Sequence, residues 1–150
     1  MLKKIIPPTT KRVQSSTNPS VNAQIKNRTV SDLNTYISSS PEILSQRIDA
    51  LNHEWDVERV VQANAAAVTL VCSLFGMRKS KCFLLTGIVG CFLLQHALQG
   101  FCPPLPFIRR LGVRTAEEIC NEKTVLKMAR GDFSVNTGSA TEMLDAVEKQ

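Results

Sequence analysis

Two long uncharged stretches dominate the hydrophobic pattern of this sequence. Residues 60–77 carry no charge over 18 positions, and residues 82–102 form a second uncharged stretch of 21 positions. An α-helix rises about 1.5 Å per residue, so these stretches measure roughly 27 and 32 Å, close to the thickness of a bilayer's hydrocarbon core. The pattern therefore predicts two transmembrane helices, at about 60–77 and 82–102.

A short basic turn joins the two predicted spans, since three of the four residues at 78–81 are Lys or Arg. Such a short turn makes the spans antiparallel neighbours. Proline lacks an N–H and clashes with the preceding helical turn, so three prolines are expected to end the second span. These are Pro103, Pro104 and Pro106. The arginines expected to mark the return to water are Arg109, Arg110 and Arg114.

Amphipathic helices are predicted on both sides of this hairpin. Ser40-Pro41-Glu42 is typical of a helix start, and apolar residues then recur at helical spacing. The apolar residues are Leu44, Ile48, Leu51 and Trp55. We expect Trp55 to lie at a membrane interface, where indole rings are enriched. Thr115 to Glu118 form a T-x-x-E capping box that starts a surface helix over about 115–130, and Gly131 ends that helix. The predicted fold class is all-α, a membrane helical hairpin with amphipathic flanking helices.

The ends of the chain differ from its middle in composition. Residues 1–39 are expected to form a mostly disordered basic tail, because residues 1–31 contain six basic residues and no acid and residues 1–30 have low hydrophobicity. The same composition is typical of an organelle transit peptide, but three prolines, Pro19 among them, interrupt an amphipathic helix. The helical membrane domain is expected to cover 40–133. A polar tail with a short helix then occupies 134–150.

The net charge of +5 is compatible with two classes of partner, nucleic acid and the lipid bilayer. The basic residues bracket the apolar stretches instead of forming a recognisable nucleic-acid-binding module, so we expect a lipid bilayer as partner and no nucleic acid. Seven basic residues flank the terminal ends of the spans and three lie in the turn. This bias favours both termini in the cytoplasm. The five cysteines show no C-x-x-C spacing. We therefore expect no metal site, no cofactor and no disulfide framework.

Polar residues within the spans are candidates for function. Counting outward from the turn places Asn64 level with Gln95, so these residues could share one intramembrane polar layer with His96 and Gln99. One interpretation is a site for a ligand, a proton or a metal ion. The other, which we favour, is hydrogen bonding between helices.

Cys102 is a candidate thiol at the end of the second span. A reactive cysteine needs access and a thiolate-stabilising environment, and two arginines follow closely in sequence. The alternative is a helix stop with an inert buried thiol.

Small residues mark both spans and allow close helix packing in lipid. On the first span they are Ala63, Ala66 and Ala67, and on the second Gly87, Gly90 and Cys91. We expect them to pack within the hairpin and between copies of the chain, which favours a homo-oligomer.

Several segments resemble one known family. They are Glu58-Arg59, the stretch FLLQHALQGFCPPLP at 92–106, the stretch RRLGVRT at 109–115, and Arg130 to Phe133. They look like the YgaP-like inner-membrane domain, over about 51–133. The resemblance implies a bacterial inner-membrane, multi-pass, two-helix domain in a family of uncharacterised function. Some relatives carry a rhodanese sulfurtransferase domain. Residues 1–59 contain no cysteine and are too short for that fold, so that activity is not carried over.

We therefore expect a non-enzymatic membrane hairpin that anchors or binds a cytoplasmic protein partner, because the sequence contains no catalytic constellation. The alternative is a membrane-associated thiol, persulfide or redox relay through Cys102. A weaker third option is an ion or haem site around His96.

Overall fold

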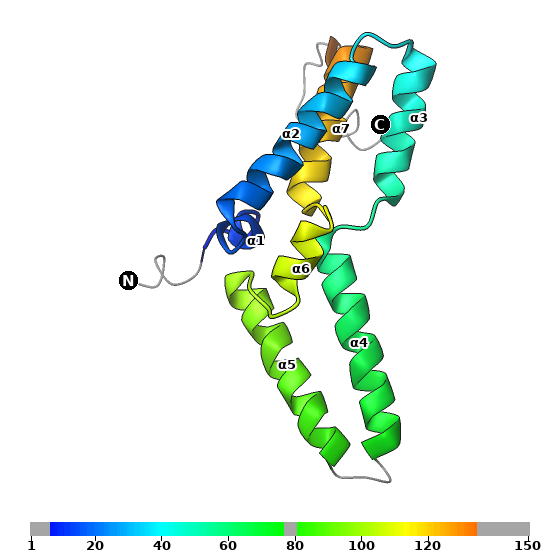
Figure 1. Cartoon of the computed structure of the whole chain (residues 1–150). Helices are drawn as coiled ribbons and strands as arrows, with labels where there is room; N and C mark the ends of the chain where they lie inside the picture. The colour runs from blue at the N-terminus through cyan, green and yellow to red at the C-terminus, as the bar shows by residue number, and fades with distance from the viewer. Residues whose placement is uncertain (1–6, 77–80, 135–150) are drawn as a thin grey trace, which may run out of the picture. The chain divides into compact units, whose positions relative to one another are not determined.

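The computed structural model describes residues 7–76 and 81–134, and these are almost entirely helical (Figure 1). The elements are α1 (Arg12–Ser15), α2 (Pro19–Tyr36), α3 (Pro41–His53), α4 (Val57–Gly76), α5 (Lys81–Gln99), α6 (Leu105–Arg110), α7 (Ala116–Arg130) and the 3₁₀ turn η2 (Asp132–Ser134). No strand occurs in these two ranges, which confirms the all-α fold class.

The chain divides into two compact units. Of the described residues, unit 1 contains 7–28, 55–76 and 81–119, and unit 2 contains 29–54 and 120–134. Unit 1 includes the whole of α4 and α5. Each unit is described by itself below.

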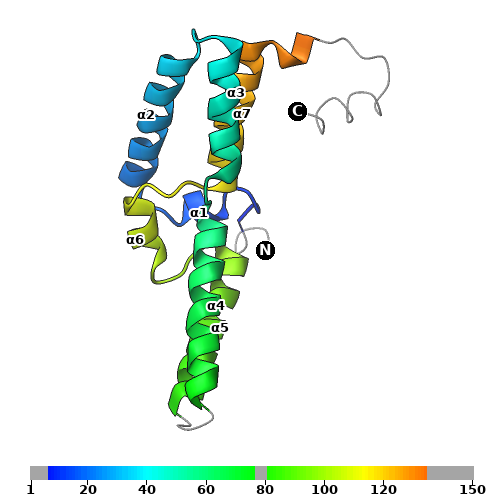
Figure 2. The ribbon, with the colours of Figure 1, turned by 90° about the vertical axis from the view of Figure 1, so that its right-hand side faces the viewer.

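Helices α4 and α5 form the predicted hairpin and are both long and apolar enough to cross a membrane. The first helix begins three residues earlier than expected, because the Asp56 carboxylate accepts a hydrogen bond from the Arg59 N–H at 2.8 Å and caps it. The predicted turn at 78–81 lies largely outside the described residues. Figure 1 shows the two helices close together where α4 ends and α5 begins and further apart at their other ends, and in the view of Figure 2 the two helices overlap.

The end of the second span was predicted three residues too late. Helix α5 ends at Gln99, because Gly100 adopts a left-handed conformation with φ of 72°. The Gly100 N–H still donates to the His96 carbonyl at 2.8 Å, as expected at a glycine-terminated helix. The chain has therefore already left the helix when it reaches the three prolines.

The prediction of a mostly disordered tail over 1–39 is wrong for the part that is described. Asn18 and Pro19 start α2: the Asn18 side chain accepts a hydrogen bond from the Ser20 N–H at 2.9 Å, and Pro19 occupies the first helical position. A proline there favours a helix instead of interrupting it. The segment also contributes buried side chains to unit 1, namely Val13, Val21 and Ile25.

Arg109 does not mark a return to water, contrary to expectation. It lies on α6 and is fully buried. Its guanidinium donates to both oxygens of Glu118 at 2.8 Å, and also to the Val113 carbonyl and the Asn22 side chain, each at 2.9 Å. Arg114 is also buried, with 7% of its surface exposed, whereas Arg110 is exposed as predicted. Glu118 and Val113 follow Arg109 within nine residues, whereas Asn22 is 87 residues away, so the sequence pattern could not reveal that these groups meet around one guanidinium.

The capping box at the start of α7 is confirmed. The Thr115 hydroxyl accepts from the Glu118 N–H at 3.2 Å, and the Glu118 carboxylate accepts from the Thr115 N–H at 2.8 Å. Gly131 ends the helix with φ of 90°, as predicted. The short last helix predicted within 134–150 lies outside the described residues.

Unit 2 buries the apolar face predicted for α3. Leu44, Ile48 and Leu51 are each at most 4% exposed, but Trp55 lies beyond the end of α3 and is 49% exposed. Arg47 links α3 to α7, because it donates to the buried Glu122 at 2.8 Å. Amphipathic packing and one buried ion pair therefore join the two helices of unit 2.

The Glu118–Arg109 pair gives the first prediction. Burial alone would raise the pKa of Glu118, but the hydrogen bonds from Arg109 and Thr115 outweigh it and hold the pKa below its usual value. The carboxylate then stabilises the fold fully above the unfolded pKa of about 4.3, and this stabilisation is lost as the pH falls through the lower folded pKa. We expect Glu118→Gln to lower the free energy of unfolding at pH 7 by about 1.5–3 kcal/mol.

Unfolding in detergent between pH 3 and 7 measures this effect. The difference between the wild type and Glu118→Gln should shrink below pH 4. Glu117→Gln is the matched control, because Glu117 pairs with the half-exposed Lys11 and should cost at most about 1 kcal/mol. A pH-independent difference for Glu118→Gln would contradict the argument.

Candidate functional site

The candidate site lies at the splayed end of the hairpin in unit 1, where α1 and α6 pack beside the start of α4 and the end of α5 (Figure 1). A chain of polar side chains crosses it. His96 Nε2 lies 3.1 Å from Glu58 Oε2, and Arg12 donates to Glu58 Oε1 at 2.8 Å. His96 is only 2% exposed. A buried imidazole is thus held by a carboxylate, which is itself held by a guanidinium.

Gly100 determines where Arg12 can lie. A Cβ at Gly100 would come within 2.4 Å of the Arg12 carbonyl carbon, and the positive φ also disfavours any side chain there. The Ser16 hydroxyl fastens the same segment by donating to the Gln99 carbonyl at 3.0 Å. The close approach of the two backbones at Gly100 therefore places Arg12 within hydrogen-bonding distance of Glu58.

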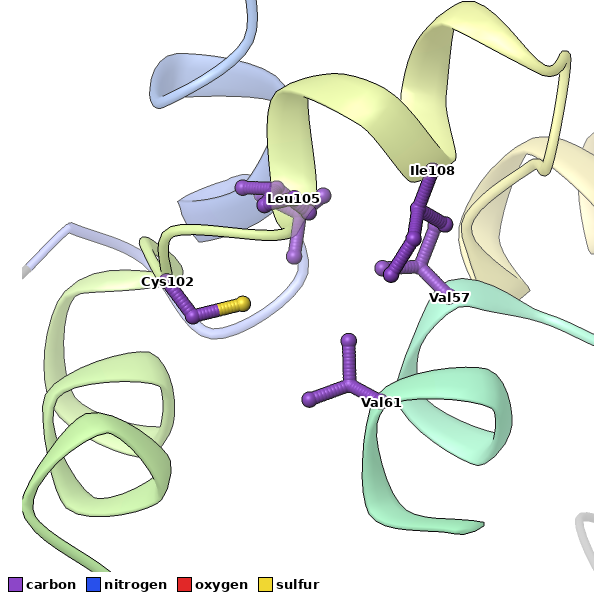
Figure 3. Packing of buried hydrophobic residues seen from close by; sticks show 6 residues of the cluster. Val57, Val61, Cys102, Leu105 and Ile108 are labelled. Atoms are coloured by element: carbon purple, nitrogen blue, oxygen red, sulfur yellow. The ribbon is translucent and has the colours of Figure 1, made fainter. Parts of the chain in front are cut away.

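Cys102 is buried in the apolar core of unit 1. It is 2% exposed and belongs to a cluster with Val13, Val57, Val61, Leu105 and Ile108. In Figure 3 its sulfur points into this cluster. The second ring nitrogen of His96, Nδ1, is buried and has no hydrogen-bond partner among the described residues.

An apolar cavity of about 480 Å³ adjoins the thiol. Side chains of α4, α5 and α6 form its walls, and Cys102 is part of the lining. The lining also includes the polar side chain of Asn64. The volume lies within the range of small-molecule sites, and the walls suit a hydrocarbon.

The predicted polar layer does not form as expected. Asn64 donates to the Val60 carbonyl of its own helix at 2.7 Å, and His96 pairs with Glu58 instead. Gln95 is half-buried and Gln99 is exposed, and neither side chain bonds to His96 within the described ranges. Counting from the turn requires the two antiparallel helices to stay side by side along their whole length, whereas α4 and α5 splay apart (Figure 1).

Glu58 and Arg12 are site residues that the sequence did not predict as such. Glu58 carried a signal, because it is the last acid before a stretch without Asp or Glu that extends to Ala116. His96 is the titratable imidazole within that stretch, so a carboxylate partner at its edge was a reasonable inference. Arg12 carried no such signal. Within 7–76 and 81–134, no cluster of three or more His, Cys, Asp or Glu side chains is arranged to hold a metal ion.

The contact at Gly100 gives the second prediction. Gly100→Ala should displace α1 and separate Arg12 from Glu58, with a loss of about 1–3 kcal/mol in the free energy of unfolding. Amide hydrogen exchange of residues 12–17 should speed up. Gly87→Ala is the matched control, because its added Cβ meets nothing within 4 Å. Equal exchange in the two variants would show that α1 is not held at Gly100.

Comparison with known proteins agrees with the resemblance. Residues 56–118 match the family described as inner membrane protein YgaP-like, transmembrane domain. The matched range contains α4, α5, α6 and the capping box of α7, and with them Glu58, His96 and Cys102. No curated protein and no solved structure matches the chain. Over residues 56–118, which include both helices of the hairpin, the chain is therefore similar to the YgaP-like transmembrane domain family.

Proposed function

We propose that the hairpin crosses the bacterial inner membrane twice and acts as a non-enzymatic anchor for a cytoplasmic protein partner. One observation carries the membrane part. Large apolar side chains on α4 and α5 remain exposed, with Leu70 at 62%, Leu84 at 70% and Leu94 at 62%. Soluble monomers rarely expose so continuous an apolar surface, whereas lipid is a suitable solvent for it.

The flanking residues support an orientation with both termini in the cytoplasm. The terminal side of the spans carries more Lys and Arg than the turn, which is the pattern of cytoplasmic flanks. Trp55 is exposed just before α4, and the Arg59 guanidinium stacks over its ring at 4.5 Å. An exposed indole beside a cation fits the headgroup region.

The anchoring role follows from the helices outside the hairpin. The amphipathic helix α3 and the later part of α7 would stand on the cytoplasmic side. Their exposed apolar side chains include Ile43 and Met128 and offer contacts for a protein partner. The alternative, a thiol or persulfide relay with a soluble donor, is less favoured because Cys102 is only 2% exposed.

A homo-oligomer is part of this proposal. An added Cβ at Gly87 or Gly90 would meet nothing within 4 Å, so these glycines are not used in packing α5 against α4. Cys91 beside them is exposed. Together these three residues give α5 a small-residue face that allows a second copy to approach closely.

The membrane assignment gives the third prediction. The wild-type chain should stay in the membrane pellet after an alkaline carbonate wash. Val71→Lys combined with Ile88→Lys places two charges near the middle of the spans, at a cost of about 2.5–3.5 kcal/mol each. This double variant should leave the membrane fraction. Met128→Lys is the control, because Met128 is 62% exposed but lies outside the hairpin.

The same membranes test the orientation. A membrane-impermeant thiol reagent should label the exposed Cys120 only after the cells are broken. Labelling of Cys120 in intact spheroplasts would contradict cytoplasmic termini. Recovery of folded wild-type chain in a detergent-free supernatant would contradict the membrane assignment altogether.

Oligomerisation gives the fourth prediction. Mild oxidation of membranes should cross-link two copies through Cys91, and Gly90→Leu should reduce the cross-linked fraction at least severalfold by blocking close approach. Leu85→Ala is the control, since Leu85 is exposed on the opposite face of α5. A chain that sediments as a monomer in detergent and never cross-links would overturn the oligomer.

A further inference from the structure

The walls of the apolar cavity in unit 1 are also part of the protein's surface. The exposed side chains that line it are Val68 of α4, Phe92 and Leu93 of α5, and Phe107 and Leu111 of α6. A molecule can therefore enter the cavity from outside the hairpin. A hairpin that lies in lipid is surrounded by acyl chains, and these match the hydrocarbon walls.

Two exposed arginines lie beside the part of the cavity that α6 forms. Arg110 follows the lining residue Phe107 by three positions, so the two side chains are neighbours on the surface of α6. Arg28 reaches the same end of α6 from α2. Its Nη1 lies 3.4 Å from the point where a Cβ would stand at Gly112, the residue after Leu111. Neither guanidinium forms an ion pair within the part of the chain that the structure describes.

These charges indicate which kind of lipid the cavity suits. An apolar cavity accepts any hydrocarbon chain, but two guanidiniums without a carboxylate partner attract an anion to its edge. A guanidinium also binds phosphate oxygens through paired hydrogen bonds. An anionic phospholipid has both a hydrocarbon chain and an uncompensated phosphate. A zwitterionic phospholipid brings a cationic amine as well, which the arginines disfavour.

A second copy of the chain suits this cavity less well than a lipid. It would bring the same two positive charges towards Arg28 and Arg110 instead of an anion. Successive side chains lie about 100° apart around a helix. The small residues Gly87 and Cys91, where we propose that copies meet, therefore face away from the lining residues Val89 and Leu93. An oligomer formed there leaves the cavity open to the bilayer.

We propose that the chain binds one anionic phospholipid, with an acyl chain in the cavity between α4, α5 and α6 and the headgroup phosphate on Arg28 and Arg110. The acyl chain fills space that the splayed helices leave between them, and the phosphate joins the first part of α2 to the end of α6. This site rests on the membrane location proposed above, and it is independent of any protein partner.

Native mass spectrometry of the full chain in detergent tests the site. The probes are dioleoyl phosphatidylglycerol and dioleoyl phosphatidylcholine, which have the same chains but an anionic and a zwitterionic headgroup. We expect one phosphatidylglycerol per chain, retained about tenfold more strongly than phosphatidylcholine. Dihexanoyl phosphatidylglycerol has the same headgroup on short chains, so it should be retained at least about tenfold less than the dioleoyl lipid.

Exchange of the arginines tests the headgroup contact. Each basic side chain favours an anionic lipid by roughly fivefold, so Arg28→Gln combined with Arg110→Gln should lower retention of phosphatidylglycerol by at least about tenfold. Retention of phosphatidylcholine should not change. Arg59→Gln is the matched control. Arg59 is equally exposed, but it lies on the side of α4 opposite the lining residues Val61 and Val68.

A change of cavity volume tests the contact with the acyl chain. Ala65 lines the cavity, so Ala65→Leu should fill part of it and lower retention of both dioleoyl lipids severalfold. Ala66→Leu is the control, because it adds the same atoms at an exposed position outside the lining. Circular dichroism of each variant verifies that the helices are intact.

Three results would overturn the proposal. They are equal retention of the two dioleoyl lipids, an unchanged preference in the arginine double variant, and loss of the Cys91 cross-link in Ala65→Leu without loss of lipid. The last result would show that a second copy covers the cavity. A chain that stays in the carbonate-washed pellet but retains no lipid would refute this proposal alone, whereas a chain that is soluble without detergent would refute the membrane location as well.

Discussion

The buried pair of Arg109 and Glu118 is the interaction on which unit 1 depends. A guanidinium without solvent contact must find its hydrogen bonds in the protein, and Arg109 finds them on a carboxylate, an amide side chain and a backbone carbonyl. These partners belong to α2, to the loop after α6 and to the first turn of α7. Loss of either charge would leave the other buried without compensation. The pair therefore holds α2 and α7 to the segment that follows the hairpin.

A second set of polar contacts lies at the end of α5 and also joins residues that are far apart in the sequence. Glu58 lies between Arg12 and His96 and contacts both. In both sets a segment from the N-terminal part of the chain supplies a partner to a residue within or after the hairpin. The N-terminal segment is thus an integral part of unit 1, and its backbone contact with Gly100 makes the site possible.

The candidate site has a polar part and an apolar part. The polar part is the contact of His96 with Glu58, which joins the end of α5 to the first turn of α4. The apolar part is the cluster that contains Cys102 together with the cavity that this residue lines. A buried free cysteine in such surroundings packs as a small hydrophobic residue.

The sequence by itself determined the features that depend on neighbouring residues. The two apolar stretches gave the hairpin, Thr115 and Glu118 gave the capping box, and Gly131 gave the end of α7. Local rules suffice in these cases because each feature is completed within a few residues.

Only the tertiary structure decided the pairing of His96 with Glu58, the docking of α1 at Gly100 and the burial of Arg109. These contacts join residues as many as 88 positions apart, as at Arg12 and Gly100. Their partners are selected by how two splayed helices meet the segments packed between them. The periodicity of the sequence does not specify that geometry. Many pairings of charged residues are compatible with the same sequence, and only the folded backbone determines which of them form.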